Sequence, residues 1–564
     1  MEQKYSGLEA VKAASRGLRG TIDTELADAS TPQVSESAYG LLKFHGTYEQ
    51  YDRDTATALK QAGQEKDWQF MVRTRIPAGR LEPSQYLVLD ALSDQFGNAT
   101  MRITTRQTIQ FHGVAKSDLR ATIASINGAL LTTLASCGDV VRNVVATPAP
   151  VRDAVHATLQ DTAALLSAAL LPRTRAHHSI FVLGSDGGEE AEEEPLFGPA
   201  YLPRKFKVGL AHPGDNTIDV LANDLGLIAE VVDGRVVGWI MCVGGGHGMT
   251  HNKPQTYPRL ATPVARVPHS ELQRAVEAVV ALARDFGNRT DRRRARLKYV
   301  VDDHGLAWVK AGIEERFGGP LEDPPPLPKL ELPELLGWHA QGTGRWWLGV
   351  PVPSGRIADT GEARLRTGLR EAIRRFGLSP VLTPQQDILL ADVEEADRGA
   401  VERLLREHGV VLAEALSPVA RWALACVALP TCGLALAEAE RVRAPMVGAI
   451  ETALRRHGLE GERISVRITG CPNGCARPYA GDIGIVGRMP GMYAIYVGGD
   501  FAGTRLSFQL HDRVREAEIG DALEPLFAAF AQDRQPGEEF GGFCSRLGRD
   551  ALLGLGAAPR LAAE

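Results

Sequence analysis

Hydrophobic and polar positions follow two periods along this chain, one typical of strands and one typical of helices. Residues 83–96 follow the helical period, with Ser84 as the expected N-cap and Gly97 as the expected end. Residues 101–113, MRITTRQTIQFHG, are rich in Ile and Thr and alternate, which predicts one strand. The same patterns predict further helices over residues 117–131, 270–286 and 520–532. We therefore expect an α+β fold, with helices and strands mixed along the chain.

The strand predicted at residues 101–113 has a polar face. Alternation places Arg102, Thr104 and Arg106 on the same side of it. A whole polar face is unusual for an element that lies deep within a chain. The strand is therefore expected either at the surface or along a charged site.

Two pairs of segments repeat the same order of elements. Residues 76–111 and 352–390 each contain a turn with Pro and Gly, a helix that ends in Phe-Gly, and a strand. Residues 223–246 and 481–500 each contain a strand, a turn, a second strand and a Gly-rich end. The chain is therefore predicted to be a duplicated α/β unit. Two copies related by a pseudo-two-fold axis would enclose a site of the kind where cofactors often lie.

The two copies differ in charge at this predicted strand. Arg102 and Arg106 of the first copy correspond to Val381 and Gln385 of the second. If both strands line one cavity, the first copy supplies its positive charge. Ahead of the first copy, residues 1–70 are polar and irregular, and we expect an arm with no core of its own that wraps around the rest.

Composition limits the classes of protein to consider. The chain has 564 residues, 44% of them apolar and 23% charged, which is typical of a globular protein of several domains. A formal charge of −6 argues against a nucleic-acid-binding protein. Apolar runs of membrane-spanning length and a secretory signal are both missing from the sequence. Seven cysteines, an odd number, suit a reducing compartment, so we expect a cytoplasmic protein.

Four of the seven cysteines form two close pairs. Cys426 and Cys432 are six residues apart, Cys471 and Cys475 are four apart, and Pro and Gly residues surround both pairs. Thiolates are the ligands that iron–sulfur clusters prefer, and a four-iron cluster commonly takes four of them. Neither pair has the C-x-x-C spacing of a zinc ribbon. Two disulfides or buried free thiols are the alternatives, and the remaining Cys137, Cys242 and Cys544 are expected to be small core residues.

The C-x5-C pair followed by TGCPNGC resembles the siroheme-containing sulfite and nitrite reductases. The motifs LRGTI, GDVVRN, LPRKFK, VGGG and NRTDRR occur in the family's order, and the resemblance extends from about Gly17 to Gly548. It implies that Cys426, Cys432, Cys471 and Cys475 bind a 4Fe–4S cluster, with Cys475 also bridging to the siroheme iron.

The resemblance also implies a three-domain architecture with the cofactors at a domain interface. The expected boundaries are residues 1–72 for an N-terminal wrapping arm, 73–140 for a ferredoxin-like half-domain, 141–323 for a siroheme- and substrate-binding domain, 324–415 for a linker and the second half-domain, and 416–564 for the 4Fe–4S- and siroheme-binding domain.

Many Lys and Arg residues lie inside apolar or Gly- and Pro-bounded segments, whereas isolated cations are usually solvated. The resemblance gives them roles. Four cations are expected to bind the substrate anion: Arg73, Arg142, Lys205 and Lys207. Siroheme contacts are expected from Arg102, Thr105, Arg106, Gln110, His112, Arg204, Gly244, Gly245, Gly246, Lys298, Gln386 and Arg477.

The function implied by the resemblance is that of an assimilatory sulfite reductase, which reduces sulfite to sulfide with six electrons. A nitrite reductase with the same cofactors is the nearest alternative, and a cluster-binding electron-transfer protein without catalysis is another. The segments PRKFK and VRN favour sulfite by resemblance. No GxGxxG motif leads from a strand into a helix, so the electron donor is expected to be a separate ferredoxin or flavoprotein subunit.

Overall fold

The computed structural model describes residues 5–183 and 193–555 and divides into two compact units. Unit 1 contains residues 1–246 and 261–412, and unit 2 contains residues 247–260 and 413–564. Each unit is described by itself. Within the described ranges, no helix is long and apolar enough to cross a membrane.

The N-terminal segment of unit 1 is helical rather than irregular. It contains α1 (Gly7–Ala13), α2 (Ile22–Ala27), α3 (Glu36–Leu42), β1 (Thr47–Tyr51) and α4 (Ala56–Gln61). The prediction of irregular structure was therefore wrong for this segment, because its short helices give no sustained periodic signal. Leu18, Ile22 and Phe44 are buried in the core that the segment shares with the rest of the unit.

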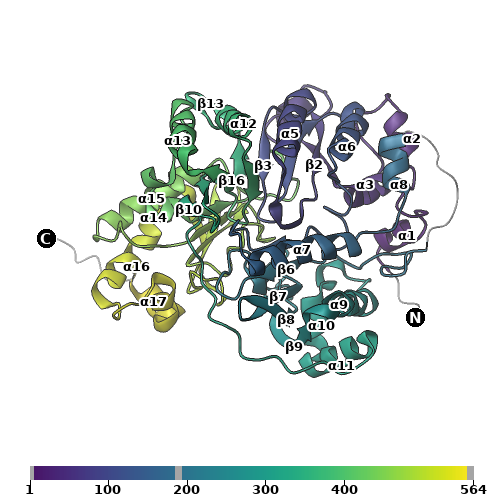
Figure 1. The fold of residues 1–564 in the computed structure, drawn as a ribbon. Helices are drawn as coiled ribbons and strands as arrows, with labels where there is room; N and C mark the ends of the chain where they lie inside the picture. The colour runs from purple at the N-terminus through teal and green to yellow at the C-terminus, as the bar shows by residue number, and fades with distance from the viewer. Residues whose placement is uncertain (1–4, 184–192, 556–564) are drawn as a thin grey trace. The chain divides into compact units, whose positions relative to one another are not determined.

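The first half-domain of unit 1 is a five-stranded sheet with the order β1-β2-β4-β3-β12 (Figure 1). Its strands after β1 are β2 (Trp68–Arg73), β3 (Met101–Ile103), β4 (Ile109–Val114) and β12 (Arg356–Ile357). Its helices are α5 (Pro83–Gln95) and α6 (Leu119–Gly128). The cap of α5 is Glu82, not Ser84, because the side chains of Glu82 and Gln85 form a capping box across the first turn.

The segment predicted as one strand, 101–113, is a hairpin of β3 and β4. Gln107 has a φ of 53°, in the left-handed region, and its backbone N–H donates to the carbonyl of Thr104. Its buried amide donates to the carbonyls of Ala78 and Leu382. These tertiary contacts hold a turn that Ile and Thr propensity hides, so the predicted alternation of Arg102 and Arg106 on one face does not apply.

The second half-domain of unit 1 repeats this design. A four-stranded sheet has the order β10 (Gly337–Ala340), β11 (Arg345–Val350), β16 (Ile388–Glu394) and β15 (Ser379–Leu382). Beside it lie a small hairpin, β13 (Asp359–Thr360) and β14 (Ala363–Arg364), and the helices α12 (Leu365–Phe376) and α13 (Arg398–Glu407). Gln386 has a φ of 73° and a buried amide that donates to Ser354, as Gln107 does to Ala78. The predicted duplication of this segment is confirmed.

The two half-domains exchange strand contacts. Strand β12, which precedes α12, pairs with β3 of the first half-domain and places Arg356 opposite Arg102. In return, Arg80 forms a bridge with Val381 of the second half-domain. The side-by-side helices α5 and α12 complete this junction (Figure 1).

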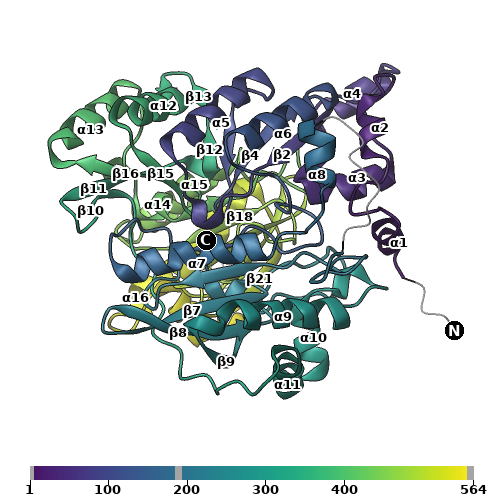
Figure 2. The same cartoon turned by 45° about the vertical axis from the view of Figure 1, so that its right-hand side comes forward.

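The remaining part of unit 1 is a mixed sheet with the order β5 (Val145–Ala146), β6 (Val208–Ala211), β7 (Leu225–Val232), β8 (Arg235–Val243) and β9 (Thr262–Pro268). Five helices belong to this part: α7 (Ala154–Ala169), α8 (Ala176–His178), α9 (Leu272–Phe286), α10 (Leu297–His304) and α11 (Leu306–Phe317). Figure 2 shows α7 running alongside these strands, with α9, α10 and α11 grouped below.

Unit 2 repeats this sheet. Its strands have the order β17 (Ala423–Ala425), β18 (Val466–Thr469), β19 (Ile483–Met489), β20 (Met492–Val497) and β21 (Phe508–Arg515). Both sheets have two parallel pairings followed by two antiparallel ones, which confirms the second duplication.

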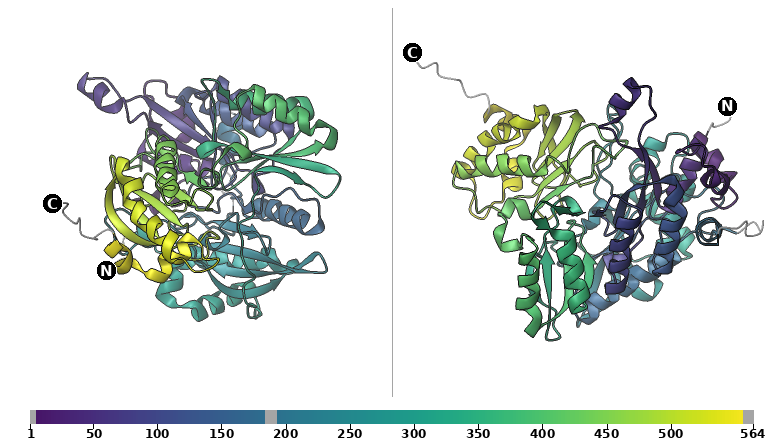
Figure 3. Two further views of the ribbon diagram at one scale, coloured as in Figure 1. Left: turned by 90° about the vertical axis from the view of Figure 1, so that its left-hand side faces the viewer. Right: turned by 90° about the horizontal axis from the view of Figure 1, so that it is seen from above.

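The helices of unit 2 are α14 (Pro418–Arg421), α15 (Arg443–Arg455), α16 (Ile519–Asp533), α17 (Phe540–Leu547) and α18 (Arg549–Leu555) (Figure 3). The helix predicted at residues 520–532 is α16.

Candidate functional site

The four paired cysteines lie in unit 2, where two parallel strands end. Cys426 follows β17, and Cys471 lies two residues after β18; the carboxyl ends of neighbouring parallel strands meet at the same sheet edge. The N–H of Cys426 donates to Ile468 at 3.1 Å, and the N–H of Gly470 points at the Cys426 thiol at 3.3 Å. The sheet thus brings the two sequence-distant pairs together.

The charges of these thiols influence one another. Burial raises the pKa of Cys426, and Cys475, Cys471 and Cys432 raise it further. Burial and Cys475 raise the pKa of Cys471 to about 12. Neighbouring thiols that resist ionisation become a set of ligands when a metal group supplies positive charge. All seven cysteines of the chain lie in described residues and none of them forms a disulfide, which argues against two disulfides.

The four thiols, all in described residues, do not form a site for a single metal ion. Within the described residues, no group of three or more His, Cys, Asp or Glu side chains is arranged to hold one metal ion. In a four-iron cluster each thiolate binds a different iron, so its ligands stand further apart than those around a single ion.

Close backbone packing fixes the loop that carries Cys471 and Cys475. A Cβ on Gly470 would lie 2.4 Å from the carbonyl of Ala437, and Gly474 has a φ of 64°. The carbonyl of Pro472 accepts hydrogen bonds from the hydroxyl of Tyr479 and the N–H of Met249, both at 3.0 Å. These contacts fix the backbone of the turn from which both thiols extend.

In unit 1, the two arginines predicted to bind the substrate anion lie together. Arg73 ends β2, and its Nη1 donates to the thiol of Cys137 at 3.2 Å. Arg142 lies on the loop after Cys137, where its Nε donates to Gly138 at 2.8 Å and its Nη1 to Ser136 at 3.1 Å. These backbone carbonyls hold the guanidinium in one orientation without neutralising it.

Two residues near these arginines were not predicted from the sequence. The Tyr48 hydroxyl is hydrogen-bonded to Arg142, and burial together with Cys137 raises the pKa of Tyr48. Lys43 lies 3.6 Å from the ring centroid of Tyr39, and burial lowers the pKa of Lys43 to about 8. Both come from the N-terminal segment, which the sequence pattern had described as an arm without a core. Cys137, expected to be an ordinary core residue, is buried but also accepts from Arg73.

The predicted lysine pair precedes β6. Burial lowers the pKa of Lys207 well below its ordinary value, and Lys205, Arg106 and Arg296 lower it further. In the part of the chain that the structure describes, the Lys207 ammonium makes no hydrogen bond and no ion pair. A half-buried cation without a counterion is costly, and a bound anion would offset that cost.

A buried ion pair holds the backbone of this lysine. The carboxylate of Asp224 accepts from the Lys207 N–H at 2.8 Å and from Nε and Nη2 of Arg296 at 2.9 and 2.6 Å. The same guanidinium donates to the carbonyl of Gly245 at 3.2 Å. One pair therefore connects the lysine segment to the Gly-rich turn after β8.

The Gly-rich turn is a close-packed cradle. A Cβ on Gly245 would lie 2.1 Å from the carbonyl of Leu221, and one on Gly246 would lie 2.7 Å from Arg296. The ammonium of Lys298 donates to the carbonyl of Gly246 at 3.1 Å, and burial followed by Arg296 lowers the pKa of Lys298 to about 7. The turn therefore places the backbone of Gly246 beside the ammonium of Lys298.

The residues predicted on the hairpin of β3 and β4 lie next to Arg73. Gln110 is opposite both Arg102 and Arg73 in the strand register. His112 is 1% exposed, and neither of its ring nitrogens has a hydrogen-bond partner among the described residues. Burial, Arg356 and Arg102 lower the pKa of His112, so the ring is neutral.

Unsatisfied donors are the feature that these residues share. Besides His112, the buried Nε atoms of Arg73 and Arg106 have no partner within the described ranges. Buried polar atoms in native proteins are normally hydrogen-bonded, so such a group of donors indicates acceptors supplied by a ligand. Siroheme, with its several carboxylates, and a small oxyanion both fit this donor set.

Some predicted residues also have structural contacts. Arg106 donates to Asn223 at 2.8 Å and to the carbonyls of Asn143 and Val208, and burial followed by Arg142 lowers its pKa to about 9. Gln386 occupies the turn that corresponds to that of Gln107. The remaining predicted contacts, Thr105 and Arg204 in unit 1 and Arg477 in unit 2, lie on loops of their units.

Comparisons with known proteins agree with these features. The model of the nitrite and sulphite reductase 4Fe-4S domain matches residues 137–321, and that of the nitrite/sulfite reductase ferredoxin-like half domain matches residues 62–129 and 339–408.

Among curated proteins, the sulfite reductase [NADPH] hemoprotein beta-component of Myxococcus xanthus is 46% identical over 96% of each chain. The sulfite reductase [ferredoxin] of Synechococcus elongatus is 44% identical over 98% of this chain and 90% of its own. Among solved structures, the NirA protein of Mycobacterium tuberculosis matches with a TM-score of 0.78 and 25% identity over 97% of each chain.

Breaking the ion pair of Asp224 should destabilise unit 1. We expect Asp224→Ala to lower the apparent free energy of unfolding by about 3 kcal/mol, because Arg296 is left as a buried charge without its partner. Chemical denaturation measures this loss. The control is Glu331→Ala, which removes an exposed ion pair with Lys329 and should have an effect below about 1 kcal/mol. If the two substitutions lowered the free energy of unfolding equally, the buried pair of Asp224 and Arg296 would not be a major source of stability.

Asp482 is the counterpart of Asp224 in unit 2, and no arginine forms an ion pair with it among the described residues. Its carboxylate accepts from the N–H and hydroxyl of Ser465 and from the N–H of Gly541. Burial raises the pKa of Asp482 to about 6. A carboxyl whose folded pKa is raised favours folding while it is protonated, and this contribution is lost as pH rises through the folded pKa.

We therefore expect stability to fall between pH 5 and pH 7 by about 1 to 2 kcal/mol through this group. Thermal unfolding at several pH values should show a smaller decline for Asp482→Asn, which cannot ionise. Parallel pH curves for the two proteins would show that Asp482 does not titrate in this range.

Proposed function

This chain belongs to the nitrite and sulfite reductase family, and we propose that it is an assimilatory sulfite reductase that reduces sulfite to sulfide. It carries siroheme and a 4Fe–4S cluster. The observation that supports sulfite reduction best is the cationic group in unit 1, in which Lys207 has no counterion among the described residues and Arg73 has an unsatisfied buried donor. Such a site favours a small oxyanion.

We infer that Arg73 and Arg142 hold the oxygens of sulfite. Their guanidinium groups present planar sets of donors that match the oxygens of an oxyanion. Burial opposes the charge of Arg142, but Tyr48 and Cys137 more than offset it and raise the pKa of Arg142. This arginine is therefore suited to polarise an S–O bond and unsuited to give up a proton.

We infer that Lys207 and Lys205 supply protons. Conversion of sulfite to HS⁻ and three waters consumes six electrons and seven protons, so the site must be resupplied repeatedly. A lysine donates readily only when its pKa lies near the working pH. The lowered pKa of Lys207 fits this role, and the lowered pKa of Lys298, about 7, makes it a candidate for proton resupply.

The siroheme-binding groups are proposed from the same donor set. His112, Arg102 and Arg106 offer buried or partly satisfied donors to carboxylates. The Gly-rich turn at residues 244–246 is proposed as a backbone contact of the macrocycle, because its glycines carry no side chain and Lys298 lies against it. Six further contacts remain part of the proposal: Thr105, Gln110, Arg204, Lys298, Gln386 and Arg477.

The proposed cluster ligands are Cys426, Cys432, Cys471 and Cys475, of which Cys475 is the proposed link to siroheme. When bound, the two cofactors accept electrons singly and provide the metal centre at which sulfite is reduced. The chain's own contribution is to hold the thiols at one sheet edge, to orient the anion, and to deliver protons.

Electrons must come from another protein. One relative described above is named for NADPH and another for ferredoxin. We propose that a ferredoxin or a flavoprotein subunit reduces this chain, and that the enzyme works in the cytoplasm, because none of its seven cysteines forms a disulfide. Sulfite-dependent oxidation of each reduced donor by the purified protein distinguishes them.

Lys207→Met tests the proposed proton donor. We expect siroheme to remain bound and the rate of sulfite reduction with reduced methyl viologen to fall about 100-fold, because general acid catalysis is lost. The control is Lys329→Met at the surface, which should leave the rate unchanged. An intact rate in Lys207→Met with full siroheme occupancy would refute this role, and faster turnover of nitrite than of sulfite in the unaltered protein would move the function to nitrite reduction.

Cys432→Ser tests the cluster ligands. We expect the unaltered protein to contain about five irons per chain, four in the cluster and one in siroheme. The substitution should lower iron and acid-labile sulfide together, because one of four thiolates is lost. Cys544→Ser, in the core of unit 2, serves as the control and should keep both. Normal iron and sulfide in Cys432→Ser would exclude this cysteine as a ligand.

A further inference from the structure

The N-terminal helix α1 carries two charged side chains that are buried. Lys12 is fully buried, and Glu9 is 3% exposed. Charged residues in a polar terminal segment are normally solvated, and complete burial of a lysine is rare unless it is paired. Neither residue is among those assigned to substrate or cofactor, so their burial requires another explanation.

Lys12 belongs to a buried network of five charges. Its ammonium lies 2.6 Å from Glu9 and 3.5 Å from Asp139. Arg292 contacts both oxygens of Asp139, with Nη1 at 2.7 Å from the oxygen that Lys12 approaches and Nη2 at 3.1 Å from the other, and Arg289 pairs with Glu9. Three cations thus surround two carboxylates, and the network as a whole is not short of positive charge.

The network holds two loops that carry the proposed anion-binding cations. On the first, Asp139 lies three residues before Arg142. On the second, the Lys12 ammonium donates to the carbonyl of Leu202 at 2.7 Å, just ahead of Arg204.

The two loops also bind each other through their backbones. Leu202 donates to Asp139 at 3.0 Å, Phe206 donates to Val140 at 3.0 Å, and Arg142 donates to Phe206 at 2.8 Å. A change at Lys12 is therefore transmitted to both loops.

The carboxylate of Asp139 is a potential competitor of the substrate. It lies 3.8 Å from Nη1 of Arg204, a proposed siroheme contact that directly precedes Lys205. Burial alone would raise the pKa of Asp139, but Arg292 and Lys12 more than offset burial, and the pKa stays below its ordinary value. Asp139 is therefore ionised, and its charge is already balanced by Lys12 and Arg292.

We propose that Lys12 is a positioning residue for sulfite binding: together with Arg292 it neutralises Asp139, which keeps Arg204 available and holds the Arg142 and Lys205–Lys207 loops in register. This inference rests on the proposed function, because it takes those cations as the anion site. Without Lys12, Asp139 draws Arg204 toward itself, and both loops lose a shared anchor. Sulfite then binds a less positive and less ordered site.

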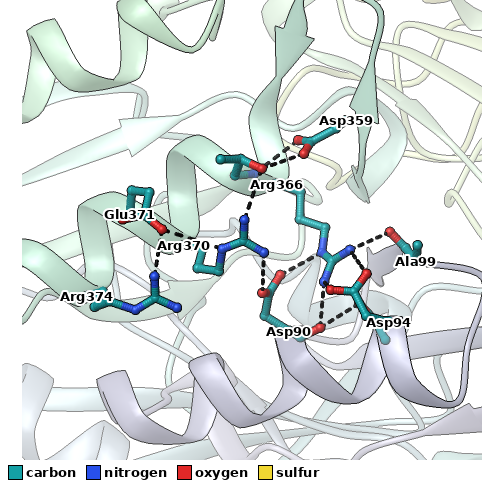
Figure 4. A network of polar contacts seen from close by, with 10 residues as sticks. Asp90, Asp94, Ala99, Asp359, Arg366, Arg370, Glu371 and Arg374 are labelled. Atoms are coloured by element: carbon teal, nitrogen blue, oxygen red, sulfur yellow. Dashed lines mark hydrogen bonds and ion pairs between the residues drawn. The ribbon is translucent and has the colours of Figure 1, made fainter.

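A second buried charge network in unit 1 provides a matched control. Arg366 of α12 binds Asp90 of α5 through Nε at 2.6 Å and binds Asp94 with both Nη atoms (Figure 4). Arg366 and Asp90 are as buried as the Lys12 network, but they connect the two half-domain helices and contact neither of the two loops. Arg366→Met should therefore cost stability without altering the anion site.

The experiment compares Lys12→Met, Lys12→Arg, Arg366→Met and Arg142→Met in the full-length holoenzyme. Sulfite affinity per bound siroheme is measured from the change in siroheme absorption, beside siroheme content, thermal midpoint and the separate values of KM and kcat. We expect Lys12→Met to weaken sulfite binding and raise KM about tenfold, with kcat changing less than about threefold. Lys12→Arg should recover most of the affinity.

The control separates positioning from general stability. Arg366→Met should lower the thermal midpoint about as much as Lys12→Met does and should keep the sulfite affinity of the unaltered protein. If Lys12→Met also keeps that affinity, Lys12 is only structural and the inference is wrong. If Arg142→Met keeps it as well, the assignment of the anion site itself fails, and the inference fails with it.

Discussion

The candidate site in unit 1 depends on gathered positive charge that the nearby carboxylates Asp139 and Asp224 only partly balance. Lys207 has no ionic partner in the described part of the chain, and His112 is forced to stay neutral among arginines. Such an arrangement opposes folding, since each buried charge loses hydration. The surrounding contacts therefore hold these residues without neutralising them: backbone carbonyls accept from the guanidinium of Arg142, and Asp224 accepts from the backbone N–H of Lys207.

The duplication shows how one scaffold serves two purposes. Asp224 and Asp482 occupy equivalent positions at the start of β7 and β19, and each accepts from the backbone N–H of the strand before it. In unit 1 the aspartate also binds Arg296, which reaches the Gly-rich turn. In unit 2 it binds the N–H of Gly541 in α17 instead. The hydrogen bond from a backbone N–H to the aspartate is common to both copies, whereas the aspartate of unit 1 also binds an arginine.

Sequence patterns predicted the parts of this protein in which local spacing determines chemistry. The cysteine pairs, the α5 helix and both duplications depend on short-range patterns, and the structure confirms the helix and the duplications. The hairpin of β3 and β4 was missed because Gln107 adopts its left-handed turn through contacts with Ala78 and Leu382, far away in sequence. Tyr48 and Lys43 were missed for a related reason: nothing near them in sequence indicates that they face Arg142 and Tyr39.

The charged pair of the N-terminal segment also depends on contacts that are distant in sequence. Read alone, Glu9 and Lys12 form an ordinary helical pair three residues apart, which on a solvated helix contributes only a few tenths of a kcal/mol. In the folded chain the pair is closed off by Asp139, Arg289 and Arg292 from loops more than 100 residues away. Burial makes this pair important for stability, because removing one partner leaves the other as an unpaired charge away from water. A polar N-terminal segment can therefore influence a site that is distant in sequence when its side chains pair with buried charges on the loops of that site.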